Sequence, residues 1–462
     1  MKTGEKIGPD LRPPAPALGG RLGMLLARLL DGAMRDAARA IAFKAAGAVL
    51  MLAAFALAAR VMDKAGFGTL VVWFNGLSFV VVVAQVGQET WIARSWHEHL
   101  GAGRDAEARG ALARAFATVL VTGTIIGLGA AIFAVMTGQG AYLAASAFLF
   151  VLALTVFAVS IPASRTIVGI GAGDGHGEVT WRSLILAGCA LLAVSGATFE
   201  APDFLLIAAL AGFASVALQV SAIRRALPES VRRARGVVDG PAWRRRSASM
   251  WASSLIDATS QFLEVLFVGL LLGPAMAAGY FAAGRLAAAF AMLSGGITNF
   301  ALRAIAKDFF AGRAVQVQAT LRRLAVAVAA AVAIGLAGIL AVGGHLLTLF
   351  GADYAVYHTT LVLLSLGTAA VALGGPASAV LVLTGHERLH AVLLGASVAA
   401  RLGAVAIGAL AFGAVGAAAA YAATIATTTI VLVVVARRLV GLDPSIFSLF
   451  ARSRVEIRDG AH

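Results

Sequence analysis

The chain has 462 residues, of which 60% are hydrophobic and 13% charged, and its formal net charge is +14. Average soluble domains carry about 25% charged residues, so this composition excludes an ordinary soluble protein. Stretches of about 20 apolar residues recur along the chain, each long enough to cross a bilayer core of about 30 Å. A membrane β-barrel is excluded because its strands are short and alternating. The prediction is an all-α polytopic membrane protein.

The N-terminal stretch, residues 1–39, is polar, rich in proline and basic. It lacks the apolar core and the cleavage site of a signal peptide, so we expect a cytoplasmic tail. Within it, LGMLLARLLDGAMRDAAR could instead form an amphipathic helix on the membrane surface.

Twelve membrane spans are predicted, in the order in which the apolar stretches occur. They lie near 40–62, 67–92, 113–136, 142–168, 182–197, 203–222, 250–272, 277–302, 324–343, 359–383, 391–412 and 416–436.

The loops between these spans alternate in charge. Basic residues gather in the tails and after the even-numbered spans, whereas the opposite side holds only Arg60 and Lys64. Because Lys and Arg collect on the cytoplasmic side, both termini are predicted to be cytoplasmic. The dispersal of basic residues over many loops argues against nucleic acid as a partner. Cys189 is the only cysteine, so no intramolecular disulfide can form.

A basic linker, residues 223–248, divides the spans into two sets of six. The predicted parts are an N-terminal bundle at 40–222, a C-terminal bundle at 249–436 and a cytoplasmic tail at 437–462. The linker's arginines suit contact with anionic lipid headgroups.

The two bundles are similar in sequence. Residues 94–114, after span two, match 303–323, after span eight, at one constant shift. Pro162 in span four matches Pro376 in span ten, and each could be a structural kink or a flexing point. Duplicated bundles of this kind are common in secondary transporters, with the substrate site between the halves.

Span seven carries polar residues that a lipid-facing helix would not keep. Asp257, Gln261 and Glu264 are spaced i, i+4, i+7 and share one helix face, which must meet protein or water. One reading is structural, with Glu264 neutralised by Arg285 across the Gly273-Pro274 turn. The other is a water-filled cavity, in which Asp257 and Glu264 bind a coupling H⁺ or Na⁺.

Lys44, Arg285 and Arg401 fall inside spans. Arg285 and Arg401 lie deep, whereas Lys44 lies nearer a cytoplasmic end, where a long side chain reaches water. Arg285, Arg401 and Gln261 are therefore candidate cavity residues, and Lys44 and Glu89 are secondary ones. Cations in such a cavity would attract an anionic substrate.

Two enzyme motifs were tested against the sequence. His386, Glu387 and His390 match the HExxH zinc pattern, but no third ligand follows in span eleven, so no metal site is predicted. No GxxxxGK[ST] phosphate loop occurs, so the chain does not hydrolyse nucleotides by that route. We expect no cofactor apart from a coupling ion.

Several stretches resemble one family. They are ALAARVMDKAGFGTLVVWFNGLSFVVVVAQVGQ within 52–91, LLLGPAMAAGYFAAGRLA at 270–287, LLTLFGADY at 346–354 and LTGHERLH at 383–390. Together they resemble Wzx-type polysaccharide flippases, a branch of the multidrug/oligosaccharidyl-lipid/polysaccharide exporter superfamily. The similarity runs from about residue 40 onward.

The resemblance implies twelve helices in two pseudo-symmetric six-helix bundles, as in MATE transporters. It implies that an oligosaccharide on a polyprenyl diphosphate is moved to the periplasmic leaflet of a bacterial inner membrane, for lipopolysaccharide or exopolysaccharide biosynthesis. Arg285 and Arg401 would face the diphosphate, and polymerase machinery is an implied partner besides membrane lipids.

Two other functions remain open from the sequence. A multidrug or cation antiporter of the same fold would suit the carboxylates of span seven. An integral-membrane glycan polymerase or ligase would need a sizeable extracytoplasmic loop, and the longest here runs only from 343 to 358. The expectation is therefore a transporter, not an enzyme.

Overall fold

The computed structural model describes residues 32–288, 305, 308, 309, 311 and 313–449. Within these ranges the chain forms helices and short connections, with no strand. Ten of the helices are long and apolar enough to cross a membrane. The predicted all-α membrane fold is confirmed.

The N-terminal bundle follows the predicted order of spans, with one extra helix. Its helices are α2 (Gly32–Val61), α3 (Lys64–Gln85), α4 (Gln88–Gly101), α5 (Asp105–Met136), α6 (Gly140–Ile167), α7 (Trp181–Ser195) and α8 (Ala201–Ala226). Predicted span two is divided between α3 and α4, because Val86 and Gly87 adopt positive φ angles of 49° and 69°.

The C-terminal bundle starts with α10 and ends with the longest helix. Its elements are α10 (Gly240–Leu272), helical residues 274–288, α12 (Ala314–Leu347), η2 (Ala352–Tyr357), α13 (His358–Leu373), α14 (Ala377–Leu383), α15 (Glu387–Val440) and η3 (Ile446–Leu449). Helix α15 contains two membrane spans joined by a kink. The kink lies at Phe412 and Gly413, which leave the helical conformation with φ of −138° and 64°. The last part of predicted span eight lies outside the described residues.

Some element boundaries differ from the predicted ones. Helix α2 begins inside the predicted tail, and the predicted linker contains α9 (Glu229–Arg233) and the first turns of α10. The start of α10 is fixed locally, since the Asp239 carboxylate accepts a hydrogen bond from the Ala242 amide. The linker is therefore partly helical.

The segment between α6 and α7 is a π-helix, η1 (Gly171–Thr180), where a loop was expected. Its sequence GAGDGHGEVT contains glycines at alternate positions, which permit unusual backbone conformations. The two matched prolines also differ in setting. Pro162 lies inside α6, whereas Pro376 stands at the break between α13 and α14.

The largest buried side chains come from both bundles. Phe55 and Phe204 from the first bundle and Phe281 and Phe350 from the second share one apolar core. Helix α10 packs against α3 of the first bundle and against α15 of the second. It therefore joins the two bundles along its length.

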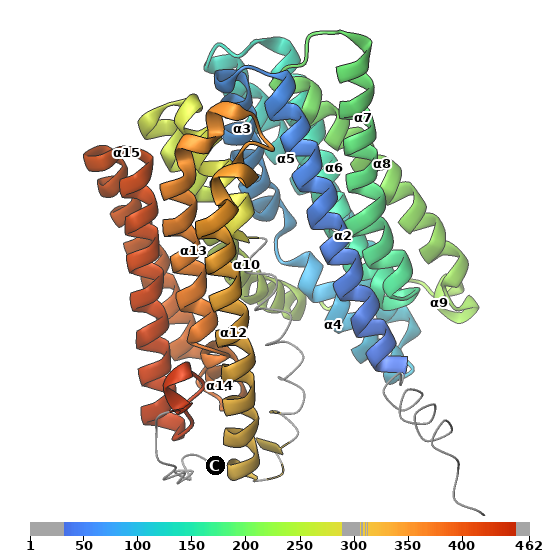
Figure 1. Cartoon of the computed structure of the whole chain (residues 1–462). Helices are drawn as coiled ribbons and strands as arrows, with labels where there is room; N and C mark the ends of the chain where they lie inside the picture. Colours follow the sequence, from blue (N-terminus) through green and yellow to red (C-terminus); the bar gives the residue numbers. More distant parts are fainter. Residues whose placement is uncertain (1–31, 289–304, 306–307, 310, 312, 450–462) are drawn as a thin grey trace, which may run out of the picture.

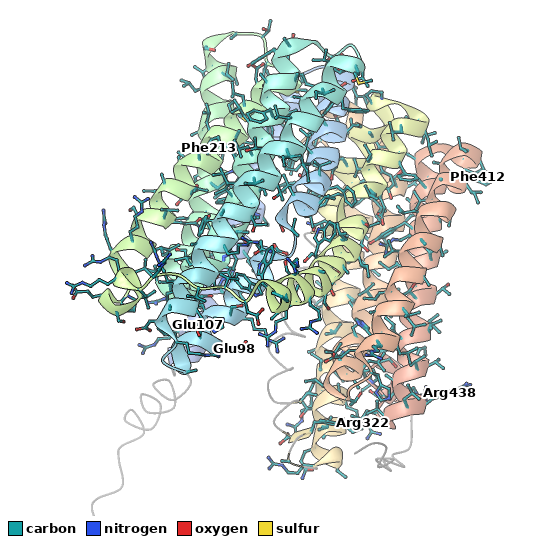
Figure 2. The ribbon with its side chains drawn as sticks, turned by 180° about the vertical axis from the view of Figure 1, so that it is seen from behind. Glu98, Glu107, Phe213, Arg322, Phe412 and Arg438 are labelled. Atoms are coloured by element: carbon teal, nitrogen blue, oxygen red, sulfur yellow. The ribbon has the colours of Figure 1, made fainter. Side chains whose placement is uncertain are left out.

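Both ends of the described chain lie at the same end of the molecule, at the bottom of Figure 1. We call this the terminal side and the opposite end the far side. Figure 2 shows Arg322 and Arg438 near the terminal side and Phe412 at the far turn of α15. The chain is a multi-pass membrane protein.

Candidate functional site

A polar cavity of about 280 Å³ lies where α10, the helix at 274–288, α13 and α15 face α3. Its charged lining residues are Glu264 and Arg285. Its polar lining residues are Asn75, Ser260, Gln261, Tyr280, Thr368 and Tyr421. Asn75, on α3, is the one contribution from the N-terminal bundle among these lining residues.

The polar stripe of α10 supplies much of this lining. Ser260, Gln261 and Glu264 face the cavity, as expected from their spacing along one helix face. Asp257 begins the same stripe but is exposed and does not line the cavity. The polar face of this span therefore meets protein and an internal space.

Glu264 is paired with Arg401 of α15, not with Arg285. The Arg401 Nε atom lies 2.8 Å from the Glu264 Oε1 atom, and the side chains are 6% and 11% exposed. The structural reading, in which Arg285 neutralises Glu264, is therefore wrong about the partner. Both residues do border one cavity, but α15 packs directly on α10 and brings Arg401 to the carboxylate.

The buried pair leaves polar atoms without a hydrogen-bond partner in the described part of the chain. These include Arg401 Nη2 and the Tyr280 hydroxyl. Arg401 does not line the cavity itself; it lies behind Glu264 and over the Tyr421 ring at 5.7 Å. The positive charge of Arg401 is thus compensated by Glu264 inside the C-terminal bundle.

Arg285 has no carboxylate partner among the described residues. Its guanidinium lies over the ring of Phe281 at 4.6 Å and over that of Phe55, in α2, at 5.5 Å. Aromatic faces hold a cation in place without neutralising it. Since Arg401 compensates Glu264, the cavity presents a net positive charge at Arg285.

On the far side, the bundles are held together by Arg60 and Lys64. Arg60 donates hydrogen bonds to the carbonyl oxygens of Leu349 and Thr348, at 2.7 and 3.1 Å. These carbonyls end α12, where a helix carries partial negative charge. Lys64 lies over the ring of Tyr357 at 4.8 Å. We call these contacts the far-side clasp.

Aromatic residues fill the space beneath the clasp. Phe67 lies 6.1 Å from Phe281, 6.3 Å from Phe350 and 6.3 Å from Tyr354, measured between ring centroids. Gly68 allows close approach, because a Cβ atom there would lie 1.9 Å from the Pro274 carbonyl oxygen. The bundles are therefore in tight contact on this side.

Comparison with solved structures shows what this architecture is. A multidrug resistance MATE transporter of the MOP superfamily, in an inward-facing conformation, superposes with a TM-score of 0.69 at 13% identity, covering 85% of this chain and 94% of that one. The chain has the MATE transporter fold.

Two further MATE-fold structures agree. A MATE protein in complex with MaD3S gives a TM-score of 0.56 at 14% identity, covering 87% of this chain and 96% of that one. A MOP superfamily transporter from Pyrococcus furiosus, described as having a binding pocket of reverse polarity, gives 0.54 at 14%, with the same coverages. No family model matches the chain, and no curated protein matches it in sequence.

The secondary candidates Lys44 and Glu89 and the ion-coupling candidate Asp257 lie elsewhere in the MATE fold. Glu89, at the start of α4, accepts a hydrogen bond of 3.0 Å from Ser254 of α10. Asp257 is close enough to His390 of α15 for their charges to interact. Lys44 is exposed on α2. None of these three candidates, Lys44, Glu89 and Asp257, lines the polar cavity.

The HExxH stretch forms no metal centre in the part of the chain that the structure describes, where no group of three metal-ligating side chains occurs. His386 instead lies 3.1 Å from the Thr384 hydroxyl through Nδ1.

Sequence reasoning missed Asn75, Tyr280 and Tyr421 because uncharged polar and aromatic residues are common in spans. It registered Arg60 and Lys64, but only as a topology signal. Their isolation on a side otherwise free of Lys and Arg could have marked them as contacts between the bundles.

Proposed function

We propose that this protein is a flippase, which moves an oligosaccharide linked through diphosphate to a polyprenyl lipid across the membrane. The observation that carries the proposal is Arg285, a cavity cation without a carboxylate partner in the described chain. A diphosphate is the group such a cation suits best, since Arg binds phosphate oxygens through paired hydrogen bonds.

The remaining lining suits a sugar. Asn75, Ser260, Gln261 and Thr368 offer donors and acceptors for hydroxyl groups. Substrate would enter from the terminal side, because the clasp closes the far side. Movement to the other leaflet then requires the clasp to open and the terminal side to close, which is alternating access.

Glu264 is the proposed coupling residue. Binding of H⁺ or Na⁺ to its carboxylate would weaken the attraction to Arg401 and leave that guanidinium uncompensated. The added positive charge behind Glu264 would strengthen the attraction of the cavity for the anionic substrate at Arg285, so ion binding and substrate binding are linked through this pair. Asp257, exposed beside His390, would be an outer site for the same ion.

A multidrug or cation antiporter is the second candidate. It is favoured by a specific observation, the Glu264 carboxylate in the cavity lining, and one structurally similar protein is a multidrug resistance transporter. We place it second because Glu264 already has a cationic partner, whereas Arg285 lacks an anionic one. No enzymatic activity is proposed.

The proposed setting is the bacterial inner membrane with both termini in the cytoplasm, since the terminal side carries most of the basic residues. Glycan polymerase machinery would use the flipped product. The N-terminal tail and the linker would contact anionic lipid headgroups.

The test is translocation of a short-chain polyprenyl-diphosphate oligosaccharide in proteoliposomes, with and without a proton gradient. Arg285→Gln should lower apparent affinity about tenfold or more, since a hydrogen bond to a charged group contributes about 1.5–3 kcal/mol. Arg438→Gln, an exposed arginine at the end of α15, is the matched control. Efflux of a cationic dye, with lipid transport absent, would instead support the antiporter.

A further inference from the structure

A second hollow lies on the outer side of the helices that form the polar cavity. It is a groove of about 770 Å³ between α3, α5 and α10, and its walls are almost entirely apolar. Gly76 and Gly129 line it, where larger side chains would fill it. Trp73 and Phe133 also line it, with their rings 6.0 Å apart.

The groove belongs to the membrane-embedded surface. All three of its helices are long and apolar enough to span a bilayer. Leu270 and Phe133, which line it, are 71% and 58% exposed. Its far-side end reaches Thr137 and Gln139, just beyond α5. The part of a ligand that lies in the apolar groove must therefore be hydrocarbon. Any polar group of the ligand must lie at the end near Thr137 and Gln139 or outside the groove.

The groove and the cavity lie back to back. On α3, Asn75 lines the cavity and the next residue, Gly76, lines the groove. On α10, Val265 lines the cavity and the next residue, Leu266, lines the groove. The seam between α3 and α10 is therefore the only partition at this level among the described residues, and its two helices belong to different bundles.

This seam is uneven along its length. At Gly269 it is closed tightly, since an added Cβ atom would lie 2.2 Å from Val72 Cγ2. One turn away, a Cβ atom on Gly76 would meet nothing nearer than Leu266 Cδ1, at 3.6 Å. At Gly76 the α3 backbone borders the groove, and Leu266 is the one side chain of α10 within 4 Å of an added Cβ atom, so the seam is loosely packed there.

We propose that the groove binds the prenyl chain of the lipid-linked substrate while its diphosphate and sugars occupy the polar cavity. This inference rests on the proposed function and adds a second subsite to it. A polyprenyl chain loses free energy when it leaves hydrocarbon, so it must stay on the membrane side of the partition. The partition parts beside Gly76 when the bundles move, which lets headgroup and chain travel together.

Filling the groove tests the proposal directly. A Cβ atom on Gly129 meets nothing within 4 Å, so Gly129→Leu places a side chain in open groove space without disturbing the packing. The matched control is Gly338→Leu in α12, where a Cβ atom also meets nothing within 4 Å but which does not line this groove. Both variants gain the same side chain in a membrane helix.

Two measurements are made on the full chain in proteoliposomes. The first compares transport of long-chain and short-chain prenyl-diphosphate oligosaccharides. We expect Gly129→Leu to lower long-chain transport at least fivefold and to leave short-chain transport unchanged, with Gly338→Leu like the wild type. The second maps, by mass spectrometry, where a photoreactive prenyl diphosphate labels the chain. We expect labelling of α3 and α5 that excess prenyl diphosphate removes.

Three outcomes would overturn the proposal: equal long-chain transport in both variants, labelling outside α3, α5 and α10, or competition by ordinary phospholipid as strong as by prenyl diphosphate. The last would make the groove a general lipid site. Failure of the flippase proposal looks different, because the wild type would then transport neither substrate. The labelling experiment would still decide whether the groove prefers a prenyl chain.

Discussion

Arg285 and Arg401 have the same charge and lie in the same bundle, yet their environments differ. Arg401 is neutralised by Glu264 at 2.8 Å, whereas Arg285 is held by the rings of Phe55 and Phe281. The charge of Arg401 is compensated within the bundle, and Arg285 retains its attraction for an anion. This division decides which residue is proposed to contact substrate.

The Glu264–Arg401 pair allows a prediction about stability. Removing one partner of a buried ion pair typically costs about 3–5 kcal/mol, because the other charge is left uncompensated. Glu264→Gln should therefore lower the unfolding temperature of the detergent-solubilised protein clearly. The double variant Glu264→Gln/Arg401→Met should recover much of the loss. A double variant as unstable as the sum of both single changes would show that the pair is not an isolated unit.

The sequence predicted the polar face of span seven but not the partner of Glu264. Spacing along one helix follows from the helix period, so Ser260, Gln261 and Glu264 could be placed together. Pairing between helices depends on which helices pack together and how each is rotated, and hydropathy specifies neither. Arg285 was close along the hairpin, but Arg401 reached the carboxylate from a distant part of the chain.

At the level of helices, the far-side clasp joins the two bundles through few contacts, and its removal can be tested. Arg60→Ala removes two hydrogen bonds between the bundles, so the far side should open more often. The chain's only cysteine, Cys189, is buried, which permits a single reporter cysteine at Ala278, a fully buried small residue of the helix at 274–288, in a Cys189→Ala background. We expect Arg60→Ala to raise maleimide labelling of that reporter severalfold.

The control for this measurement is Lys44→Ala, which removes an exposed cation from the same helix, α2. Labelling that rises equally in the control would point to a general loosening. Unchanged labelling in Arg60→Ala would mean that the aromatic residues alone keep the far side closed.

The contact between α3 and the Gly273-Pro274 turn gives a second prediction for the helices. In Gly68→Ala the new methyl group would lie 1.9 Å from the Pro274 carbonyl oxygen, so the helices must move apart. Such overpacking costs typically about 1–3 kcal/mol. Thermal unfolding should show the loss, whereas Gly101→Ala, with nothing within 4 Å of its Cβ atom, should not. Equal stability of the two variants would contradict this view of the contact.

Helix existence was predictable here, and helix shape was not. Runs of about 20 apolar residues identify spans because the bilayer fixes their length. The π-helix at Gly171–Thr180 and the division of predicted span two at Val86 and Gly87 depend on backbone angles that packing selects. The interruption of α15 at Phe412 and Gly413, in contrast, lies at the predicted boundary between spans eleven and twelve. The start of α10 within the basic linker was missed, since its first turns are polar and carry no apolar signal.

For the whole molecule, the orientation in the membrane follows from charge and can be measured. Val356 is 76% exposed on the far side, and Val237 is 55% exposed in the linker. With cysteines placed singly at these positions, an impermeant maleimide added to intact cells should label position 356 at once. Position 237 should react only after permeabilisation. The reverse pattern would place both termini outside and reverse the proposed direction of transport.

The arrangement of the two bundles could not be derived from the sequence. Duplication suggested two similar halves, but their relative placement depends on which conformation the protein adopts. In this structure the clasp and the aromatic cluster bring the two bundles together on the far side. These contacts depend on the packing of the bundles, which hydropathy does not specify.

The Arg60 clasp has a consequence for how this protein can change through evolution. Both acceptors are main-chain carbonyl oxygens, those of Thr348 and Leu349, which every amino acid provides. Substitutions at these two positions are therefore silent for the clasp as long as α12 still ends there. The hydrogen bonds therefore constrain only the side chain at position 60, whereas the side chains at positions 348 and 349 can change without loss of these bonds.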